Sequence, residues 1–181
     1  MALTATIHRF DIELSDVGRG VYETLELRVA RHPSESARYM VARVLAYGLS
    51  YEAGIEFGRG VSTAEEPAVW VRDLRGDLVA WIEIGHPTVE RLHRASKTGA
   101  RVRVYAHKDP YPLVRELLKS PIHRQDELEV WQLPAAVLDA LEVAVERHER
   151  WSLTVSDGEL YSTRNGETLS GAIARCSLAP S

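Results

Sequence analysis

Two glutamates on one predicted hairpin carry the main chemical signal of the sequence. A turn over 73–76 joins a strand that starts near residue 68 to a nearly continuous apolar strand over 77–85. Antiparallel pairing about this turn places 66–68 opposite 83–85, which brings Glu66 beside Glu83. Paired carboxylates suit Mg²⁺ or Mn²⁺, and such an ion polarises a phosphoryl oxygen and supplies a hydroxide at neutral pH. The spacing therefore predicts a metal site for phosphate chemistry.

Glu83 has a second interpretation, because it is a charged residue in an otherwise apolar strand, next to Ile82 and Ile84. A bare carboxylate in the interior costs several kcal/mol, so it must be paired, hydrogen-bonded or bound to a cation. The alternative to a metal is a salt bridge to Arg91 or Arg94 of the following segment. An open cleft that holds Glu66 and Glu83 within about 5 Å of each other favours an enzyme. An enclosed Glu83 paired with an arginine argues against one.

Composition and missing motifs exclude several classes of protein. The sequence has no Gly-rich phosphate loop, no Gly-x-Ser-x-Gly elbow and no His-Glu-x-x-His segment. Its one cysteine, Cys176, excludes a disulfide framework and a cysteine-based zinc site. The mean hydropathy is −0.20, and no apolar run approaches the roughly 18–20 residues of a membrane span. We therefore expect a cytoplasmic globular protein with neither a secretory signal nor a membrane segment.

Charge is distributed unevenly along the 181 residues, whose net charge is −4. Residues 91–124 contain 9 basic and 2 acidic residues, whereas 1–90 and 125–181 carry net charges of −5 and −6. All three lysines lie in this basic block, at Lys97, Lys108 and Lys119. Such asymmetry predicts contact with a polyanion. The alternative is a basic surface helix whose charges are answered by acidic neighbours.

The elements that position these residues follow from hydrophobic periodicity. A long hairpin is predicted over 3–31, and a helix over 35–48 with Ser34 as its N-cap. The strand 77–85, a helix over 88–98 with Pro87 at its first position, and a strand over 101–107 form a crossover unit with parallel strands. The other predicted elements are a strand near 53–58, a helix at 112–119, a strand at 128–131, a helix at 135–145, and strands at 151–155, 160–163 and 169–174. This order indicates an α/β fold in a single domain over 1–181.

Several segments resemble the YaeQ family over essentially the whole length of the chain. They are Met-Ala-Leu-Thr-Ala-Thr-Ile at 1–7, Ala-Arg-His-Pro-Ser-Glu at 30–35, Arg59–Gly60, Glu66–Pro67 with Trp70, Trp-Ile-Glu-Ile-Gly-His-Pro at 81–87, and Leu153 to Gly158. The resemblance implies a variant of the PD-(D/E)xK nuclease-like fold. That fold is a restriction-endonuclease-like mixed sheet flanked by helices, with its core over roughly 35–131. The N-terminal hairpin 3–31 and a C-terminal β-meander over 150–175 are then elaborations.

The resemblance also implies roles for individual carboxylates. Glu83 matches the acidic residue of the (D/E)xK strand, and Glu66 matches the first acidic position. Asp73 and Asp77 are rivals for that first position, although they lie in the turn, far along the hairpin from Glu83. Glu35 begins the helix that resembles the first core helix of the nuclease fold, which often contributes a carboxylate. The implied metal ligands are therefore Glu66, Glu83 and Glu35.

The chain departs from the nuclease pattern at Gly85, where a lysine is expected two residues after Glu83. In such folds that lysine positions the attacking water, helps to deprotonate it and stabilises the pentavalent phosphate. Related nucleases move the cation to the next helix, and the candidates here are Arg91, Arg94, Lys97 and, at the end of the adjacent strand, Lys108. Arg91 is nearest the helix start, and Lys97 lies roughly 15 Å beyond it. Arginine clamps phosphate but is no general base at neutral pH.

Two functional hypotheses follow from these residues. The first is a Mg²⁺-dependent (or Mn²⁺-dependent) nuclease acting on DNA or RNA, in which Arg91 or Arg94 contacts the phosphate and the block 91–124 follows the backbone. The second is a catalytically inactive nuclease-fold protein that binds or regulates, in a transcription or repair complex. The sequence identifies no protein partner.

Overall fold

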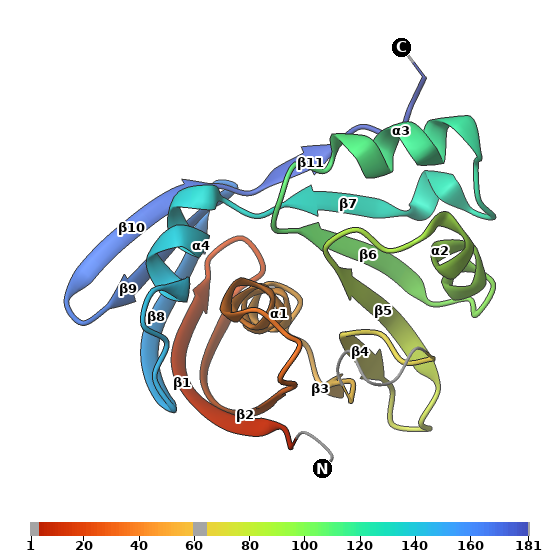
Figure 1. Cartoon of the computed structure of the whole chain (residues 1–181). Helices are drawn as coiled ribbons and strands as arrows, with labels where there is room; N and C mark the ends of the chain where they lie inside the picture. The colour runs from red at the N-terminus through yellow and green to blue at the C-terminus, as the bar shows by residue number, and fades with distance from the viewer. Residues whose placement is uncertain (1–3, 60–64, 181) are drawn as a thin grey trace.

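The computed structural model describes residues 4–59 and 65–180. Its polypeptide folds into two mixed sheets that face each other across a central helix (Figure 1). Gly60 of the family-like segments lies outside the described residues. None of the described helices is long and apolar enough to cross a membrane.

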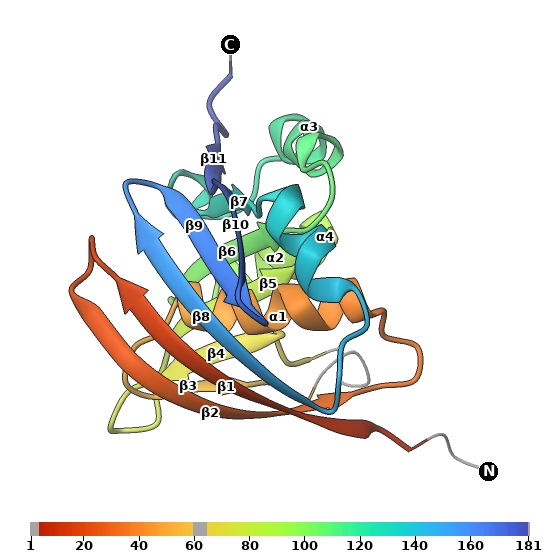
Figure 2. The same ribbon diagram turned by 90° about the vertical axis from the view of Figure 1, so that its left-hand side faces the viewer.

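The first sheet joins the two ends of the chain. Its strand order is β10-β9-β8-β1-β2. The strands are β1 (Thr6–Asp16), β2 (Val21–Arg31), β8 (His148–Ser156), β9 (Glu159–Arg164) and β10 (Glu167–Ala172). The predicted N-terminal hairpin and C-terminal meander are both confirmed, but β1 also pairs with β8 in parallel. The two predicted elaborations therefore form one continuous sheet, which the local sequence pattern did not reveal (Figure 2).

The second sheet contains the predicted crossover unit. Its strand order is β11-β7-β6-β5-β4-β3. The strands are β3 (Ile55–Phe57), β4 (Val69–Arg72), β5 (Leu78–Ile84), β6 (Arg101–Ala106), β7 (Glu129–Gln132) and β11 (Ala174–Cys176). β5 and β6 are parallel neighbours, as predicted, and β7 continues the parallel set. The run predicted as one strand over 169–174 is instead divided between β10 and β11, which belong to different sheets.

Helices fill the space between the sheets and cover one outer face. They are α1 (Ala37–Leu49), α2 (Val89–Ser96), α3 (Tyr111–Lys119) and α4 (Ala135–Glu142), with a short 3₁₀ turn η1 (Gln125–Glu127). The main core packs α1 and α4 against residues of both sheets. A second core packs α2 and α3 against the opposite side of β6 and β7. β5 therefore has one face toward α1 and the other toward α2.

Two predicted helix starts are wrong by one or two residues. The N-cap of α1 is Ser36, whose hydroxyl accepts a hydrogen bond from the Tyr39 backbone N–H, and not Ser34. The chain first turns at Glu35, whose N–H donates to the carbonyl oxygen of His32 at 2.9 Å. Likewise Thr88 caps α2, which leaves Pro87 outside the helix. Glu35 therefore precedes the helix that it was predicted to begin.

Candidate functional site

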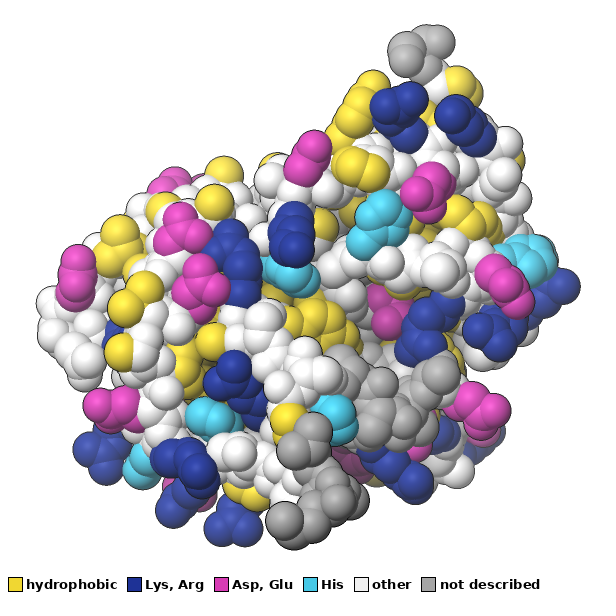
Figure 3. Space-filling view, viewed as in Figure 1, with side chains coloured by type: hydrophobic (Ala, Val, Ile, Leu, Met, Phe, Trp, Pro, Cys, Tyr) yellow, Lys and Arg dark blue, Asp and Glu magenta, His cyan; other side chains and the backbone are white. Residues whose placement is uncertain are grey.

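The predicted site residues converge where the parallel strands β5 and β6 end. Ile84 is level with Tyr105, and the Gly85 N–H donates to the Tyr105 carbonyl oxygen at 2.9 Å. Ligands of open α/β sheets bind at the carboxyl ends of parallel strands. The strand-end cluster, as we name it, consists of Tyr39, Glu83, Gly85, Arg91 and His107. Figure 3 shows a hollow in this face of the molecule, with basic, acidic and histidine side chains around it.

Glu83 is enclosed and ion-paired. Its side chain is 6% exposed, and its Oε1 accepts hydrogen bonds from Arg91 Nε at 2.6 Å and Trp81 Nε1 at 2.7 Å. Burial raises the pKa of Glu83 above its ordinary value, although the Arg91 charge and both hydrogen bonds act in the opposite direction. Of the two arrangements considered for Glu83, the structure has the arginine pair.

The same arrangement occurs twice more among the described residues. Each example combines a strand glutamate, a tryptophan two residues away on the same strand face, and an arginine. The three sets are Glu83 with Trp81 and Arg91, Glu129 with Trp131 and Arg103, and Glu149 with Trp151 and Arg164. The indole N–H and the guanidinium together satisfy a carboxylate that would otherwise be unpaired in the interior. This recurrence indicates that the Glu83 arrangement stabilises a strand glutamate within the fold.

The carboxylate of Glu66 is bound elsewhere in the strand-end region. Continuation of the β4–β5 register puts residue 66 level with residue 85, as the sequence predicted. Its Oε2 accepts a hydrogen bond from the Arg59 N–H at 2.9 Å, and its Oε1 lies 3.4 Å from Arg59 Nε. Its carbonyl oxygen, however, accepts from Arg91 Nη2 at 2.6 Å. Arg91 therefore connects the main chain at Glu66 with the carboxylate of Glu83.

Glu35 belongs to a separate ion pair. Its two oxygens accept from Arg43 Nε at 2.7 Å and Arg43 Nη2 at 2.9 Å, and both residues are buried. The pair lies beside Tyr39, whose pKa is raised chiefly by burial. The charges of Glu83 and Glu35 raise it further, while those of Arg43 and Arg91 lower it. Tyr39 therefore lies between two Glu–Arg pairs, and the charge of each carboxylate is compensated by its own arginine.

The three predicted metal ligands therefore have three different arginine partners: Arg43 for Glu35, Arg59 for Glu66 and Arg91 for Glu83. Within residues 4–59 and 65–180, no group of three or more His, Cys, Asp or Glu side chains is arranged to hold a metal ion. The rival acids Asp73 and Asp77 flank the turn, where the Asp73 carboxylate accepts from the Asp77 N–H. A divalent cation at Glu83 would compete with the Arg91 guanidinium for Oε1.

Two members of the cluster, Tyr39 and His107, were missed as site residues. The His107 ring lies edge-on to the Tyr39 ring with a centroid distance of 5.9 Å, and its buried Nδ1 has no hydrogen-bond partner among the described residues. Burial, together with the charges of Lys108 and Arg38, lowers the pKa of His107. The available signal was positional: residue 107 is the last residue of the strand predicted over 101–107, which runs parallel to the strand of Glu83, and in the structure it directly follows β6. Lys108 follows His107 directly in the chain, at the sheet edge where it was predicted.

The backbone conformation explains why a glycine stands at position 85, where the nuclease pattern has a lysine. Gly85 has φ +83°, a conformation that costs an L-residue roughly 1–2 kcal/mol, and a Cβ there would lie 3.3 Å from His107 Nε2. We expect Gly85→Ala to lower the free energy of unfolding by about 1–3 kcal/mol, measured by urea denaturation. Gly76→Ala is the matched control, because Gly76 has φ +86° but no atom near the added carbon. Equal losses in the two variants would show that the His107 contact contributes nothing.

The basic block is only partly neutralised by acidic neighbours. Besides Arg91, the paired members are Arg101 with Glu52, Arg103 with Glu129, and Arg124 with Glu127. Within the described chain, the members that form no ion pair are Arg94, Lys97, Lys108, Arg115 and Lys119. Arg94 and Lys97 lie at the end of α2, away from Glu83, and Arg115 and Lys119 lie on the adjacent α3. Basic side chains therefore gather over α2 and α3 (Figure 3).

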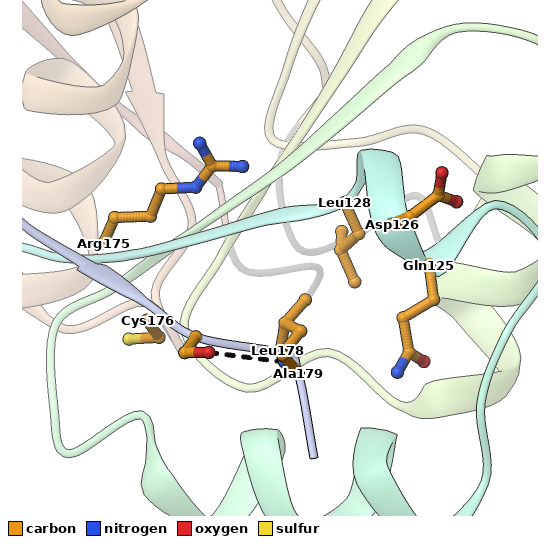
Figure 4. Close-up of a pocket in the computed structure, with 8 residues that line it drawn as sticks. Gln125, Asp126, Leu128, Arg175, Cys176, Leu178 and Ala179 are labelled. Atoms are coloured by element: carbon orange, nitrogen blue, oxygen red, sulfur yellow. Dashed lines mark hydrogen bonds between the residues drawn. The ribbon is translucent and has the colours of Figure 1, made fainter. Parts of the chain in front are cut away.

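A pocket of about 600 Å³, drawn in Figure 4, is lined by none of the residues of the strand-end cluster. Its walls come from η1, β11 and the segment after β11, and they include Arg175 and Cys176. Burial raises the pKa of the Cys176 thiol, with a further contribution from the charge of Asp109. The thiol is therefore held in its less nucleophilic, protonated form. None of the predicted site residues lines this pocket.

The fold and the cluster define a two-sheet α/β protein with an arginine-bound glutamate at its parallel strand ends. The family model described as YaeQ protein matches residues 1–172, so the chain belongs to the YaeQ family. It is 29% and 28% identical, over 162 residues, to the proteins named "Uncharacterized protein YaeQ" from Salmonella typhi and Escherichia coli (strain K12). These matches cover 89% of this chain and 90% of each relative.

Solved structures show the same similarity. The crystal structure of YaeQ protein from Pseudomonas syringae matches with a TM-score of 0.87 at 28% identity, over 96% of each chain. The structure of YaeQ protein from Xanthomonas axonopodis pv. citri matches with a TM-score of 0.84 at 30% identity, over 95% of this chain and 97% of that one. The family resemblance predicted from the sequence is confirmed.

Proposed function

We propose that this chain is a nucleic-acid-binding protein with a restriction-endonuclease-like PD-(D/E)xK core that does not cleave its ligand. The observation that carries the proposal is the state of Glu83, which is enclosed and bound by Arg91 and Trp81. A nuclease of this class needs that carboxylate ionised and directed at a metal. Here the carboxylate is enclosed, and its Oε1 is directed at the Arg91 guanidinium and the Trp81 indole N–H.

The basic side chains over α2 and α3 supply the binding surface in this proposal. Arg94, Lys97, Arg115 and Lys119 are exposed, and none has an acidic partner among the described residues. Phosphate backbones bind such surfaces by releasing counterions, so the net charge of the whole chain matters less than the local excess. In this proposal, the basic residues of 91–124 that lie unneutralised on α2 and α3 bind the phosphate backbone.

Fluorescence anisotropy tests this surface with labelled single- and double-stranded DNA and RNA at low salt. Reversing Arg94 and Lys97 to glutamate is expected to weaken binding about tenfold or more and to reduce its salt dependence. Arg75→Glu with Arg147→Glu is the matched control, because it makes the same charge change outside α2 and α3. Equal weakening by both double variants, or no binding by the wild type, would contradict the proposal.

The same samples test the absence of cleavage. Incubation with Mg²⁺ or Mn²⁺ is expected to leave every substrate intact. Metal-dependent cleavage by the wild type that Glu83→Gln abolishes would overturn this part of the proposal and support the nuclease instead.

One observation favours a metal-dependent nuclease as the second candidate. The Arg91 guanidinium is held between the Glu83 carboxylate and the Glu66 carbonyl oxygen, with both contacts at 2.6 Å. Carboxylate and carbonyl oxygens are also the ligands that Mg²⁺ and Mn²⁺ prefer. If nucleic acid draws Arg91 onto a phosphate, these two oxygens become available to a metal.

A further inference from the structure

The strand β2 forms a long, unpaired edge of the first sheet. It contains 11 residues, and within the described chain it pairs only with β1 (Figure 2). One carbonyl oxygen near its end, that of Ala30, accepts from Arg43 Nη2 at 3.0 Å. An unpaired edge of this length is a template for pairing with another strand.

Two charges on the solvent face of β2 are poorly matched within the chain. Glu26 is directly opposite Asp11 on β1, and Arg28 is directly opposite Arg9. Like charges in such cross-strand pairs are destabilising. Asp11 forms ion pairs with His148 and Arg150, whereas Glu26 and Arg28 make no ion pair with any described residue. Both side chains are exposed.

The sequence of β2 is complementary to itself in one antiparallel register. A two-fold axis at Leu27 places Glu26 of each copy opposite Arg28 of the other. Symmetric registers centred on Glu26 or Arg28 oppose like charges. Those centred on Leu25 or Val29 put neither charge opposite a carboxylate or guanidinium. The register at Leu27 also keeps the buried face of both copies on the same side of the sheet.

We propose that two copies of this chain associate through antiparallel β2–β2 pairing centred on Leu27, which joins their first sheets into one continuous sheet. The interface is isologous, so the Glu26–Arg28 pair forms twice, once on each side of the two-fold axis. The pairing satisfies free backbone groups of the edge and the side chains of Glu26 and Arg28 together.

Sedimentation equilibrium of the full chain at low salt, from about 5 to 200 µM, tests the proposal. The wild type is expected to form a dimer. Glu26→Arg is expected to raise the dimer dissociation constant about tenfold or more, because the substituted guanidinium then faces Arg28 of the second copy. The same change relieves the clash with Asp11 in the monomer, so its melting temperature is expected not to fall.

The charge-swapped double variant Glu26→Arg with Arg28→Glu is expected to restore association to within about threefold of the wild type. Glu167→Arg makes the same charge change on β10, at the other edge of the sheet, and is expected to leave association unchanged. A wild type that stays monomeric throughout the range, or a dimer that Glu26→Arg does not weaken, would overturn the proposal.

Discussion

Replacing Arg43 by alanine is expected to lower the free energy of unfolding by about 3–5 kcal/mol, the loss typical of a buried pair that loses one partner. The Arg43 side chain is 2% exposed and that of Glu35 is fully enclosed, so Glu35 would be left as a buried charge without a cation, with only the His32 N–H, among the described residues, donating to its Oε2. The Ala30 carbonyl oxygen would lose its donor as well. Urea denaturation at neutral pH measures the loss.

Arg38→Ala is the control for the Arg43 experiment, because it removes an arginine five residues away on the same helix. Arg38 pairs with Asp139 and Glu142 near the surface, where such pairs contribute about 1 kcal/mol or less. Arg43→Met combined with Glu35→Leu is expected to recover most of the loss, because neither buried charge then remains. A small effect of Arg43→Ala would mean that Glu35 finds another partner, and its use as a metal ligand would then return to consideration.

The sequence predicts local elements far better than their assembly. The crossover unit is predictable because an apolar strand, a helix and a returning strand each follow a short periodic pattern. The pairing of β1 with β8 is not, since it joins strands from the two ends of the chain and depends on a shared buried face. The N-cap of α1 shifts because the Ser34 hydroxyl is hydrogen-bonded to His32 Nδ1 at 2.7 Å, whereas the Ser36 hydroxyl accepts from the Tyr39 N–H.

The candidate site shows the same division. Arg91 was one of the predicted partners of Glu83, because Glu83 lies near the end of a predicted strand and Arg91 lies near the start of the helix that follows it. Tyr39 enters the cluster only because α1 packs between the sheets, which no spacing within 77–107 encodes. The role of Trp81 was visible in principle, since tryptophan and glutamate two residues apart recur at 129–131 and 149–151.

Removing Arg91 is expected to show how much the buried charge of Glu83 destabilises the fold when it has no cation beside it. At about pH 7.5, Arg91→Ala is expected to lower the free energy of unfolding by about 3 kcal/mol, because Glu83 keeps its burial and loses its cation. The pKa of Glu83 is already raised by burial, and the loss of Arg91 raises it further. When the pKa of a carboxyl group is raised in the folded state, the free energy of unfolding of the protein falls as pH rises through that pKa. The deficit of Arg91→Ala should therefore shrink towards about pH 4, where Glu83 is protonated.

Manganese separates the two candidate functions in the same variant. Arg91→Ala leaves the Glu83 carboxylate and the Glu66 carbonyl oxygen without the cation that they share, so Mn²⁺ is expected to raise its urea midpoint saturably if these oxygens form a latent metal site. Adding Glu83→Gln should abolish that response and should itself recover stability at about pH 7.5, since no buried charge remains. A wild type that Mn²⁺ does not stabilise, beside an Arg91→Ala variant that it does, would mean that the guanidinium is what excludes the metal. If neither responds, the oxygens around Arg91 are arranged for a guanidinium alone, and the metal-dependent nuclease loses the one observation that favours it.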